Sequence, residues 1–310
     1  MTGLALMFPG QGSQAVGMGC DLCAAEPLMQ QTYAEASRDL DFDLEQLCRT
    51  GTADQLGRTD VTQPALLAHS VGVFRILRRD GLRFRAAFGH SVGEYAALVA
   101  TGALDFADAL HLVQRRGQEM LRAAEASPGG MAAVIGLGDD AVEELCAASD
   151  GVWPANYNSP GQVVVSGTKA ALDDLAAKAT AAGAKRVIPL AVSGAFHSPL
   201  VASAVAPLRV ELERTPWHTP DPAFFSPSSV AFETGGFVDL LARQLVSPVR
   251  FTQAVNALYS AGYDAFLEVG PGSVLSGLVK RIVPEATVAR AGDAETIAAL
   301  REDRRYWEGS

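Results

Sequence analysis

The sequence predicts an α/β fold in which a large domain with a parallel sheet contains a small inserted subdomain. At residues 4–14, 86–104 and 266–283, a short apolar run ends in a glycine-containing turn before a polar or helical segment. Strand, tight turn and helix in succession are typical of α/β proteins. The pattern changes after residue 130, and a chain of 310 residues is long enough for two substructures.

The first half of the large domain contains two predicted strands and three predicted helices. LALMF at 4–8 favours a buried strand, and AAFGH at 86–90 favours a second strand that turns sharply into a helix. Residues 61–82 predict an amphipathic helix with Pro64 in its first turn and Gly81 past its end. Residues 103–126 predict another long helix.

The middle of the chain predicts a subdomain with strands and helices in the order βαββαβ. The segments are 131–137, 139–149, 152–158, 161–167, 171–183 and 185–192. This order is ferredoxin-like, and the preceding loop SPGG suits a domain junction. We therefore predict a ferredoxin-like subdomain at 126–190 inserted into a large domain of residues 1–125 and 191–310.

Charge and composition exclude several classes of protein. The formal net charge of -10 disfavours a nucleic-acid or anionic-membrane surface, because both attract mainly Lys and Arg. No apolar run approaches the ~20 residues of a membrane span, and the N-terminus lacks signal-peptide features, so we expect a cytoplasmic protein. Cys20 and Cys23 form a CxxC pattern, but no second pair or suitably spaced His completes a metal site.

GHSVG, residues 89–93, matches the G-x-S-x-G pattern of a nucleophile elbow. It stands between a predicted strand and a predicted helix, which is the context that this motif requires. The glycines allow a cramped turn that places Ser91 at the start of the helix, where the backbone N–H of Val92 can donate to an oxyanion. Ser91 is therefore the candidate nucleophile, and the large domain is predicted to be α/β-hydrolase-like.

A serine nucleophile needs a base, which is usually a histidine. The chain has five: His69, His90, His111, His197 and His218. Two lie in helical patterns, His90 leaves the turn in a different direction from Ser91, and His218 lies in a predicted surface loop. His197 follows the small subdomain in a loop between substructures, where clefts form. We choose His197 as the candidate base.

Arg116 lies in VQRRGQEM, 25 residues after Ser91. A guanidinium beside the nucleophile could bind a free carboxylate through two charge-assisted hydrogen bonds. An arginine in a helix can equally face solvent, which is the role expected for Arg115, and spacing alone does not choose between these two interpretations for Arg116.

Taken together, these motifs resemble those of malonyl-CoA:acyl carrier protein transacylases, including the free-standing acyltransferases that serve modular polyketide synthases. The similarity extends over nearly the whole chain in the family's order. It is carried by FPGQGSQ (8–14), TQPAL (62–66), GHSVGEYAAL (89–98), RRG (115–117), NSPGQVVVSG (158–167), AFH (195–197), RQLVSPVRFT (243–252) and EVGPGSVLSGLVKRI (268–282).

The resemblance implies a role for each catalytic residue. Ser91 matches the nucleophile and His197 the general base. Gln244 matches the residue whose backbone carbonyl orients that histidine in place of a triad carboxylate. Gln11 matches the residue whose main-chain amide forms the oxyanion hole together with the amide of Val92.

The resemblance also implies which residues bind the acyl group. Arg116 matches the arginine that binds the malonyl carboxylate, and Gln63 and Asn158 fall in motifs that line the same cleft. Phe196 would fill the space of a 2-methyl group and so favours malonyl over methylmalonyl. Gly194 departs from the malonyl-type motif, which commonly has His at this position.

We therefore expect transfer of a malonyl group from coenzyme A to the phosphopantetheine thiol of an acyl carrier protein, through an acyl-Ser91 intermediate with ping-pong kinetics. No cofactor or metal is expected, and the protein should act as a monomer. Because such carriers are acidic, we expect docking at Lys280 and Arg281. A second basic cluster could be a docking site or an ordinary solvated face: Arg75, Arg78, Arg79, Arg83 and Arg85.

Three alternatives stay open. The chain could be a hydrolase that edits carrier-bound acyl groups, a trans-acting acyltransferase for another acyl unit, or a catalytically silent docking subunit. Arg116 argues against the hydrolase, because hydrolases of simple acyl groups have no use for a cation in the acyl pocket. The presence of nucleophile, base and oxyanion residues argues against the silent subunit.

Overall fold

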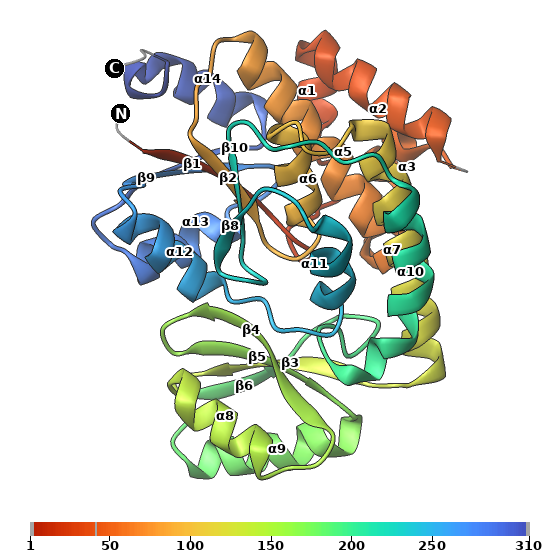
Figure 1. Cartoon of the computed structure of the whole chain (residues 1–310), viewed down its shortest axis with the longest axis vertical. Coiled ribbons are helices and arrows are strands. Elements are labelled where there is room, and N and C mark those ends of the chain that lie inside the picture. The colour runs from red at the N-terminus through yellow and green to blue at the C-terminus, as the bar shows by residue number, and fades with distance from the viewer. Residues whose placement is uncertain (1–2, 41, 308–310) are drawn as a thin grey trace.

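The structure is a computed structural model that describes residues 3–40 and 42–307. Its larger sheet has six strands in the order β10-β9-β1-β2-β7-β8, and only β8 runs antiparallel to its neighbour (Figure 1). The strands are β1 (Leu4–Phe8), β2 (Ala86–Gly89), β7 (Ala223–Ser226), β8 (Ala231–Glu233), β9 (Ala265–Val269) and β10 (Thr287–Ala291). The two strands predicted at 4–8 and 86–90 are thus neighbours at the centre of the sheet.

Helices cover both faces of this sheet, because successive residues of its central strand are all apolar. In β1, Leu4, Leu6 and Phe8 face one buried cluster, whereas Ala5 and Met7 face the other. The first cluster includes α5 and α7, and the second includes α12 and α13. Both helices predicted before and after the elbow are present, as α5 (Thr59–Arg79) and α7 (Phe106–Ala126).

Among the described residues, the large domain contains ten further α-helices besides α5 and α7. They are α1 (Cys20–Ala25), α2 (Pro27–Asp39), α3 (Leu44–Thr50), α4 (Ala53–Gly57), α6 (Gly93–Ala100), α10 (Val205–Arg214), α11 (Phe237–Gln244), α12 (Phe251–Ser260), α13 (Val274–Ile282) and α14 (Ala294–Glu302), with 3-10 turns η1 (Pro199–Ala204) and η2 (Arg304–Tyr306). Across residues 3–40 and 42–307, no helix has the length and apolar character needed to cross a membrane.

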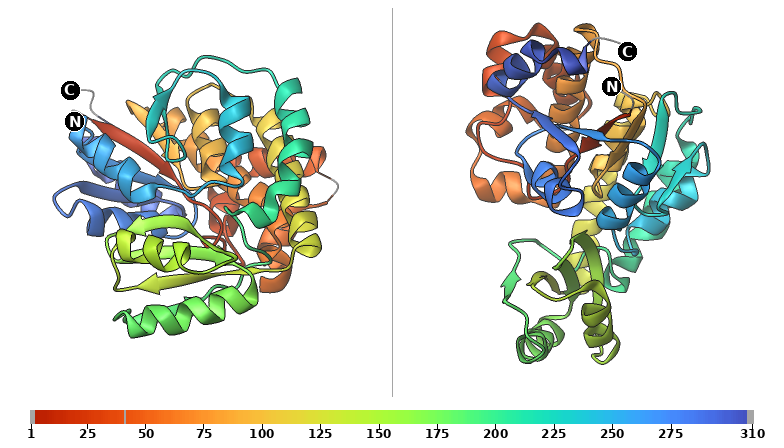
Figure 2. Two further views of the ribbon diagram at one scale, coloured as in Figure 1. Left: turned by 60° about the horizontal axis from the view of Figure 1, so that its bottom comes forward. Right: turned by 90° about the vertical axis from the view of Figure 1, so that its left-hand side faces the viewer.

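A smaller sheet of four antiparallel strands lies beside the large domain (Figures 1 and 2). Its elements follow one another as β3 (Gly130–Ile135), α8 (Asp139–Ala147), β4 (Val152–Ser159), β5 (Gln162–Gly167), α9 (Lys169–Ala181) and β6 (Arg186–Pro189). This is the predicted βαββαβ order. One face packs on α8 and α9 through Ala132 and Val134, and the other packs toward the large domain through Met131 and Ala133.

Backbone hydrogen bonds connect the smaller sheet to a loop of the large domain. The Tyr157 N–H donates to the Val249 carbonyl at 2.9 Å, and the Val249 N–H donates to the Ala155 carbonyl at 2.8 Å. These bonds join β4 of the smaller sheet to the loop before α12 of the large domain. The division into 126–190 and a discontinuous remainder stays a prediction.

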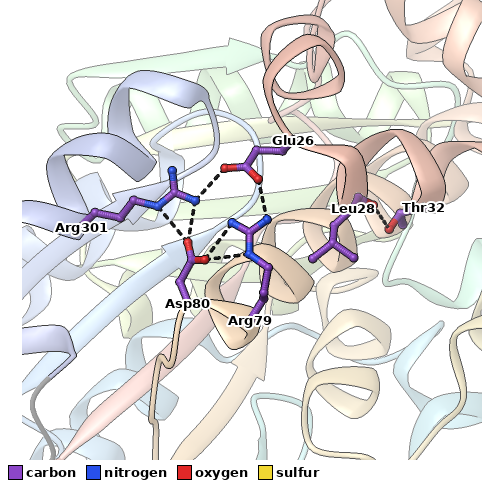
Figure 3. A network of polar contacts seen from close by, with 6 residues as sticks. All are labelled: Glu26, Leu28, Thr32, Arg79, Asp80 and Arg301. Atoms are coloured by element: carbon purple, nitrogen blue, oxygen red, sulfur yellow. Dashed lines mark hydrogen bonds and ion pairs between the residues drawn. The ribbon is translucent and has the colours of Figure 1, made fainter.

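A network of four charged side chains ties the C-terminal helix to the rest of the large domain (Figure 3). Arg301 on α14 lies 2.6 Å from both Glu26 and Asp80, and Arg79 lies 2.7 Å from the same two carboxylates. Arg75 is similarly engaged with Glu35 at 2.6 Å. Arg75 and Arg79 of the second basic cluster thus already have intramolecular partners.

Candidate active site

Ser91 lies in a tight turn between β2 and α6, and its backbone has φ 54°. Such a left-handed conformation is uncommon for a residue with a side chain. The glycines on either side make it possible by allowing close backbone contact. A Cβ on Gly89 would lie 2.0 Å from the Gly93 carbonyl carbon, and one on Gly93 would lie 2.1 Å from the Phe8 carbonyl oxygen. Both glycines of GHSVG are therefore required by the turn.

His197 contacts Ser91 directly, with 2.8 Å between Nε2 and the serine Oγ. Its Nδ1 lies 3.0 Å from the Gln244 carbonyl oxygen and 3.1 Å from that of Ser247. Because carbonyl oxygens only accept, Nδ1 carries the proton and Nε2 accepts from the serine hydroxyl. His197 also has a left-handed backbone, with φ 58°. The histidine is thus held in the tautomer that can remove the serine proton.

The electrostatic environment keeps His197 neutral. Burial, and secondly the positive charge of Arg116, lower the pKa of this imidazole to about 3. At neutral pH the ring in the free protein is therefore an unprotonated acceptor.

The other histidines have different surroundings. His90 lies 3.0 Å from Asn158 Oδ1, and burial lowers its pKa. His69 contacts the Gly292 carbonyl at 2.9 Å, and burial lowers its pKa to about 4. His111 and His218 are exposed. Of the five, His197 is the one that lies against Ser91.

Arg116 is fully buried beside the nucleophile, with 1% of its surface exposed. Its Nη2 donates to Ser91 Oγ at 3.0 Å and to Gln244 Oε1 at 2.9 Å, and its Nη1 donates to Gln63 Oε1 at 2.7 Å. Its Nε has no hydrogen-bond partner among the described residues. Arg115 instead pairs with Glu119 at 3.0 Å. Arg116 thus contacts the nucleophile, as expected, whereas Arg115 pairs with a carboxylate on its own helix.

Two polar chains extend from Arg116. In the first, Gln63 Nε2 donates to Thr59 Oγ1 at 2.9 Å, and that hydroxyl donates to Gln11 Oε1 at 3.0 Å. In the second, Gln244 Nε2 donates to Glu94 Oε1 at 2.9 Å. Thr59 and Glu94 were not among the predicted site residues. Glu94 directly follows the elbow and is the one charged residue of the otherwise apolar helix α6. That contrast in the sequence could have indicated a role in the site.

Gln11 and Val92 both line the cavity at Ser91. The backbone N–H groups of Gln11 and Val92 donate to no backbone carbonyl in the turns and loops of residues 3–40 and 42–307. Val92 precedes the first residue of α6, where backbone N–H groups point out of the helix. Their role as donors to an oxyanion stays a prediction.

The cavity beside Ser91 has a volume of about 80 Å³ and is mostly apolar apart from the groups described above. Its apolar wall comes from α7, β3 and the loop after β6. The residues of this wall are Met120, Met131, Leu190, Val192 and Phe196. Asn156 also lines the cavity and was missed, whereas Asn158 contacts the site through His90.

Gly194 is explained by packing. A Cβ at this position would lie 2.5 Å from the Ala124 Cβ and 3.2 Å from the Phe196 ring. Ser166 on β5 donates to the Phe196 carbonyl and so holds the segment that precedes His197. A side chain at position 194 would therefore require α7 and Phe196 to shift.

Lys280 and Arg281 are exposed in the last turn of α13. Arg281 donates to Gln162 Oε1 at 2.9 Å, which connects α13 to the small sheet. Neither residue lines the cavity at Ser91.

A larger cavity of about 240 Å³ lies elsewhere, and Cys20, Cys23 and Cys48 are among its lining residues. Burial raises the pKa of Cys23 to about 11 and that of Cys48 to about 12, so these two thiols stay protonated at neutral pH. In the part of the chain that the structure describes, no cluster of His, Cys, Asp and Glu is arranged to hold a metal ion.

Comparison with known proteins gives consistent matches over nearly the whole chain. The family model described as an acyl transferase domain matches residues 6–306. The chain is 44% identical over 308 residues to the malonyl CoA-acyl carrier protein transacylase of Escherichia coli K12, covering 97% of this chain and 100% of that protein.

Solved structures are similar as well. An acyl carrier protein S-malonyltransferase from Vibrio cholerae superposes with a TM-score of 0.92 at 42% identity, covering 96% of this chain and 99% of that one. A malonyl-transacylase solved in complex with its type II PKS acyl-carrier protein superposes with a TM-score of 0.95 at 40% identity, covering 97% and 100%. The predicted α/β class and the predicted resemblance are confirmed, and the chain belongs to the acyl transferase domain family.

Proposed function

We propose that this protein transfers a malonyl group from coenzyme A to the phosphopantetheine thiol of an acyl carrier protein. The observation that carries the proposal is the direct contact of Ser91 with both His197 and the buried Arg116 in one small cavity. A base on one side activates the hydroxyl, and a cation on the other side selects an acyl group with a free carboxylate. The names of the relatives point to the same reaction.

In the first half-reaction, His197 Nε2 takes the proton of Ser91 while Oγ attacks the thioester carbonyl carbon. The amides of Gln11 and Val92 stabilise the tetrahedral oxyanion, a contribution of roughly 3 to 4 kcal/mol for one such donor. The C–S bond then breaks, and the coenzyme A thiolate leaves with the proton held by His197. The product is a malonyl ester of Ser91.

In the second half-reaction, the phosphopantetheine thiol of the carrier gives its proton to His197 and attacks the ester. The C–O bond to Ser91 breaks, and the proton returns to Oγ. Because the first product leaves before the carrier reacts, the kinetics should be ping-pong. The Gln244 and Ser247 carbonyls accept from Nδ1 and stabilise the imidazolium in both steps.

The acyl group is selected by charge and by size. On binding, the malonyl carboxylate would receive donors from Arg116, whose Nη2 contacts Ser91 Oγ in the free protein. Phe196 narrows the cavity where a 2-methyl group would lie. A short unbranched dicarboxylic acyl group therefore fits this site best.

The partners follow from the reaction. Lys280 and Arg281 are exposed and carry the charge that an acidic carrier would contact. The chemistry uses acyl-CoA as a substrate and needs no cofactor. We propose that the protein acts as a monomer and that the reaction takes place in the cytosol.

The proposal is tested by incubating the protein with malonyl-CoA and a phosphopantetheine-bearing carrier. The carrier should gain the mass of a malonyl group, and Ser91→Ala should abolish the gain. Release of free malonate without carrier loading would instead identify an editing hydrolase, and faster transfer from another acyl-CoA would identify a different substrate.

A further inference from the structure

The Gln244 side chain lies between a cation and a carboxylate. Its Oε1 accepts from Arg116 Nη2 at 2.9 Å, and its Nε2 donates to Glu94 Oε1 at 2.9 Å and to the Ser91 carbonyl at 3.1 Å. A guanidinium only donates and an ionised carboxylate only accepts. Only one of the two orientations of the amide satisfies both neighbours.

Glu94 is the charged acceptor that favours this orientation, together with the Ser91 carbonyl. It has no exposed surface, and its carboxylate accepts from Ser226 Oγ at 2.7 Å, Ser228 Oγ at 2.8 Å and Gln244 Nε2. Burial raises the pKa of Glu94 above its ordinary value, and these three hydrogen bonds and the charge of Arg116 offset part of that rise. A buried carboxylate is costly unless it is fully hydrogen-bonded, and here donors reach both of its oxygens.

Arg116 and Glu94 are close without touching. Among residues 3–40 and 42–307, no carboxylate forms an ion pair with Arg116, and its side-chain partners are the neutral groups of Gln63, Gln244 and Ser91. A carboxylate in direct contact would compete with the substrate for the guanidinium. Glu94, which is separated from Arg116 by the Gln244 amide, stabilises the positive charge of the guanidinium. The N–H groups of Arg116 can still exchange their neutral partners for a substrate carboxylate.

We propose that Glu94 is a positioning residue for substrate recognition: it orients the Gln244 amide so that Arg116 is held beside Ser91 without a competing ion pair. This inference rests on the proposed function, in which Arg116 binds the acyl carboxylate. Without Glu94, Gln244 Nε2 keeps only the Ser91 carbonyl of its two acceptors, so rotation of the NH₂ group toward Arg116 becomes less costly. Two donors would then face each other, and the guanidinium would leave its position.

The test is Glu94→Gln, which keeps the shape and removes both the charge and the preference for one amide orientation. The KM for malonyl-CoA should rise, and the ratio of kcat/KM for malonyl-CoA to that for acetyl-CoA should fall about tenfold, equivalent to about 1.4 kcal/mol. The kcat for acetyl-CoA should change little. In the Arg116→Ala background the same substitution should leave the ratio unchanged.

A matched control is Glu268→Gln. Glu268 is also a fully buried glutamate, but it accepts from the Leu275 and Ser276 amides at the start of α13, away from the cavity. Its substitution should lower the thermal unfolding midpoint without changing the ratio. An equal loss of both substrates in Glu94→Gln, or an undiminished fall of the ratio in the Arg116→Ala background, would overturn the inference.

If Glu94→Gln does not fold, Gln244→Met tests the same link, because it removes the amide and keeps the backbone carbonyl that contacts His197. The same fall of the ratio is expected, and an unchanged ratio would overturn the inference. Failure of the proposed function looks different. In that case the wild-type protein would show no preference for malonyl-CoA, or Arg116→Ala would leave the preference intact.

Discussion

Two arginine–carboxylate clusters in this molecule are built in opposite ways. In the surface network, Arg301 contacts Glu26 and Asp80 directly at 2.6 Å, with its side chain 39% exposed. In the active site, Arg116 is buried and is separated from Glu94 by the amide of Gln244. The first arrangement uses up the donors of the arginine to join helices. In the second, the donors of the arginine contact neutral groups, which a substrate carboxylate would displace under the proposed function.

The largest expected effect comes from removing the active-site cation. Arg116→Ala should lower kcat/KM for malonyl-CoA about a hundredfold, at the upper end of the roughly 1.5–3 kcal/mol of a charge-assisted hydrogen bond. The activity with acetyl-CoA should be retained or rise. Arg115→Ala, on the same helix, is the matched control and should change neither. Equal losses for both acyl groups would mean that Arg116 is structural.

Exchanging the side chains of Glu94 and Gln244 would place a carboxylate directly against Arg116, as in the surface network around Arg301. The double variant Glu94→Gln/Gln244→Glu keeps one carboxylate but moves it into direct contact with Arg116. Because the substrate must then displace an ion pair, the KM for malonyl-CoA should rise by about ten- to a hundredfold. Steady-state kinetics with both acyl-CoAs measures this, and an unchanged KM would show that the spacing by an amide has no role.

The charge of Arg116 should also be visible in the pH profile. Burial and this cation hold the pKa of His197 far below its ordinary value, at about 3, so protonation limits the free enzyme only at low pH. Arg116→Ala removes a cation that opposes protonation and should move the acid limb of kcat/KM for acetyl-CoA to higher pH. A limb that stays in place or moves to lower pH would contradict the assignment.

The smallest effect is expected at the surface. Arg301→Ala should lower the free energy of unfolding by about 1 kcal/mol or less, because partly exposed ion pairs contribute little. Malonyl transfer should stay at the wild-type rate. Denaturant unfolding measures the first quantity, and a large loss of transfer activity would show that the two clusters are coupled.

The sequence predicted those parts of the site that depend on local motifs. The strand–turn–helix context of Ser91 and the loop position of His197 correspond to what the structure contains. The βαββαβ order was also readable, because each element has its own periodicity and a turn at its end.

The parts that depend on distant contacts were not predicted. Glu94 lies in the first turn of α6, where an acidic residue ordinarily faces solvent and complements the helix dipole. Its burial follows from Ser226 and Ser228, more than 130 residues away, in and after a strand of only four residues. The position of Arg116 was implied by the resemblance alone, because spacing along the chain does not give the rotation of α7 relative to the elbow.

In the proposed reaction Ser91 carries a malonyl group that a buried cation has selected. Intact-protein mass spectrometry after brief incubation with equal amounts of malonyl-CoA and acetyl-CoA, followed by peptide mapping, would show the acyl group and its location. We expect one malonyl adduct per chain, located on Ser91. An adduct on another residue, or predominant acetylation of Ser91, would contradict the proposed reaction.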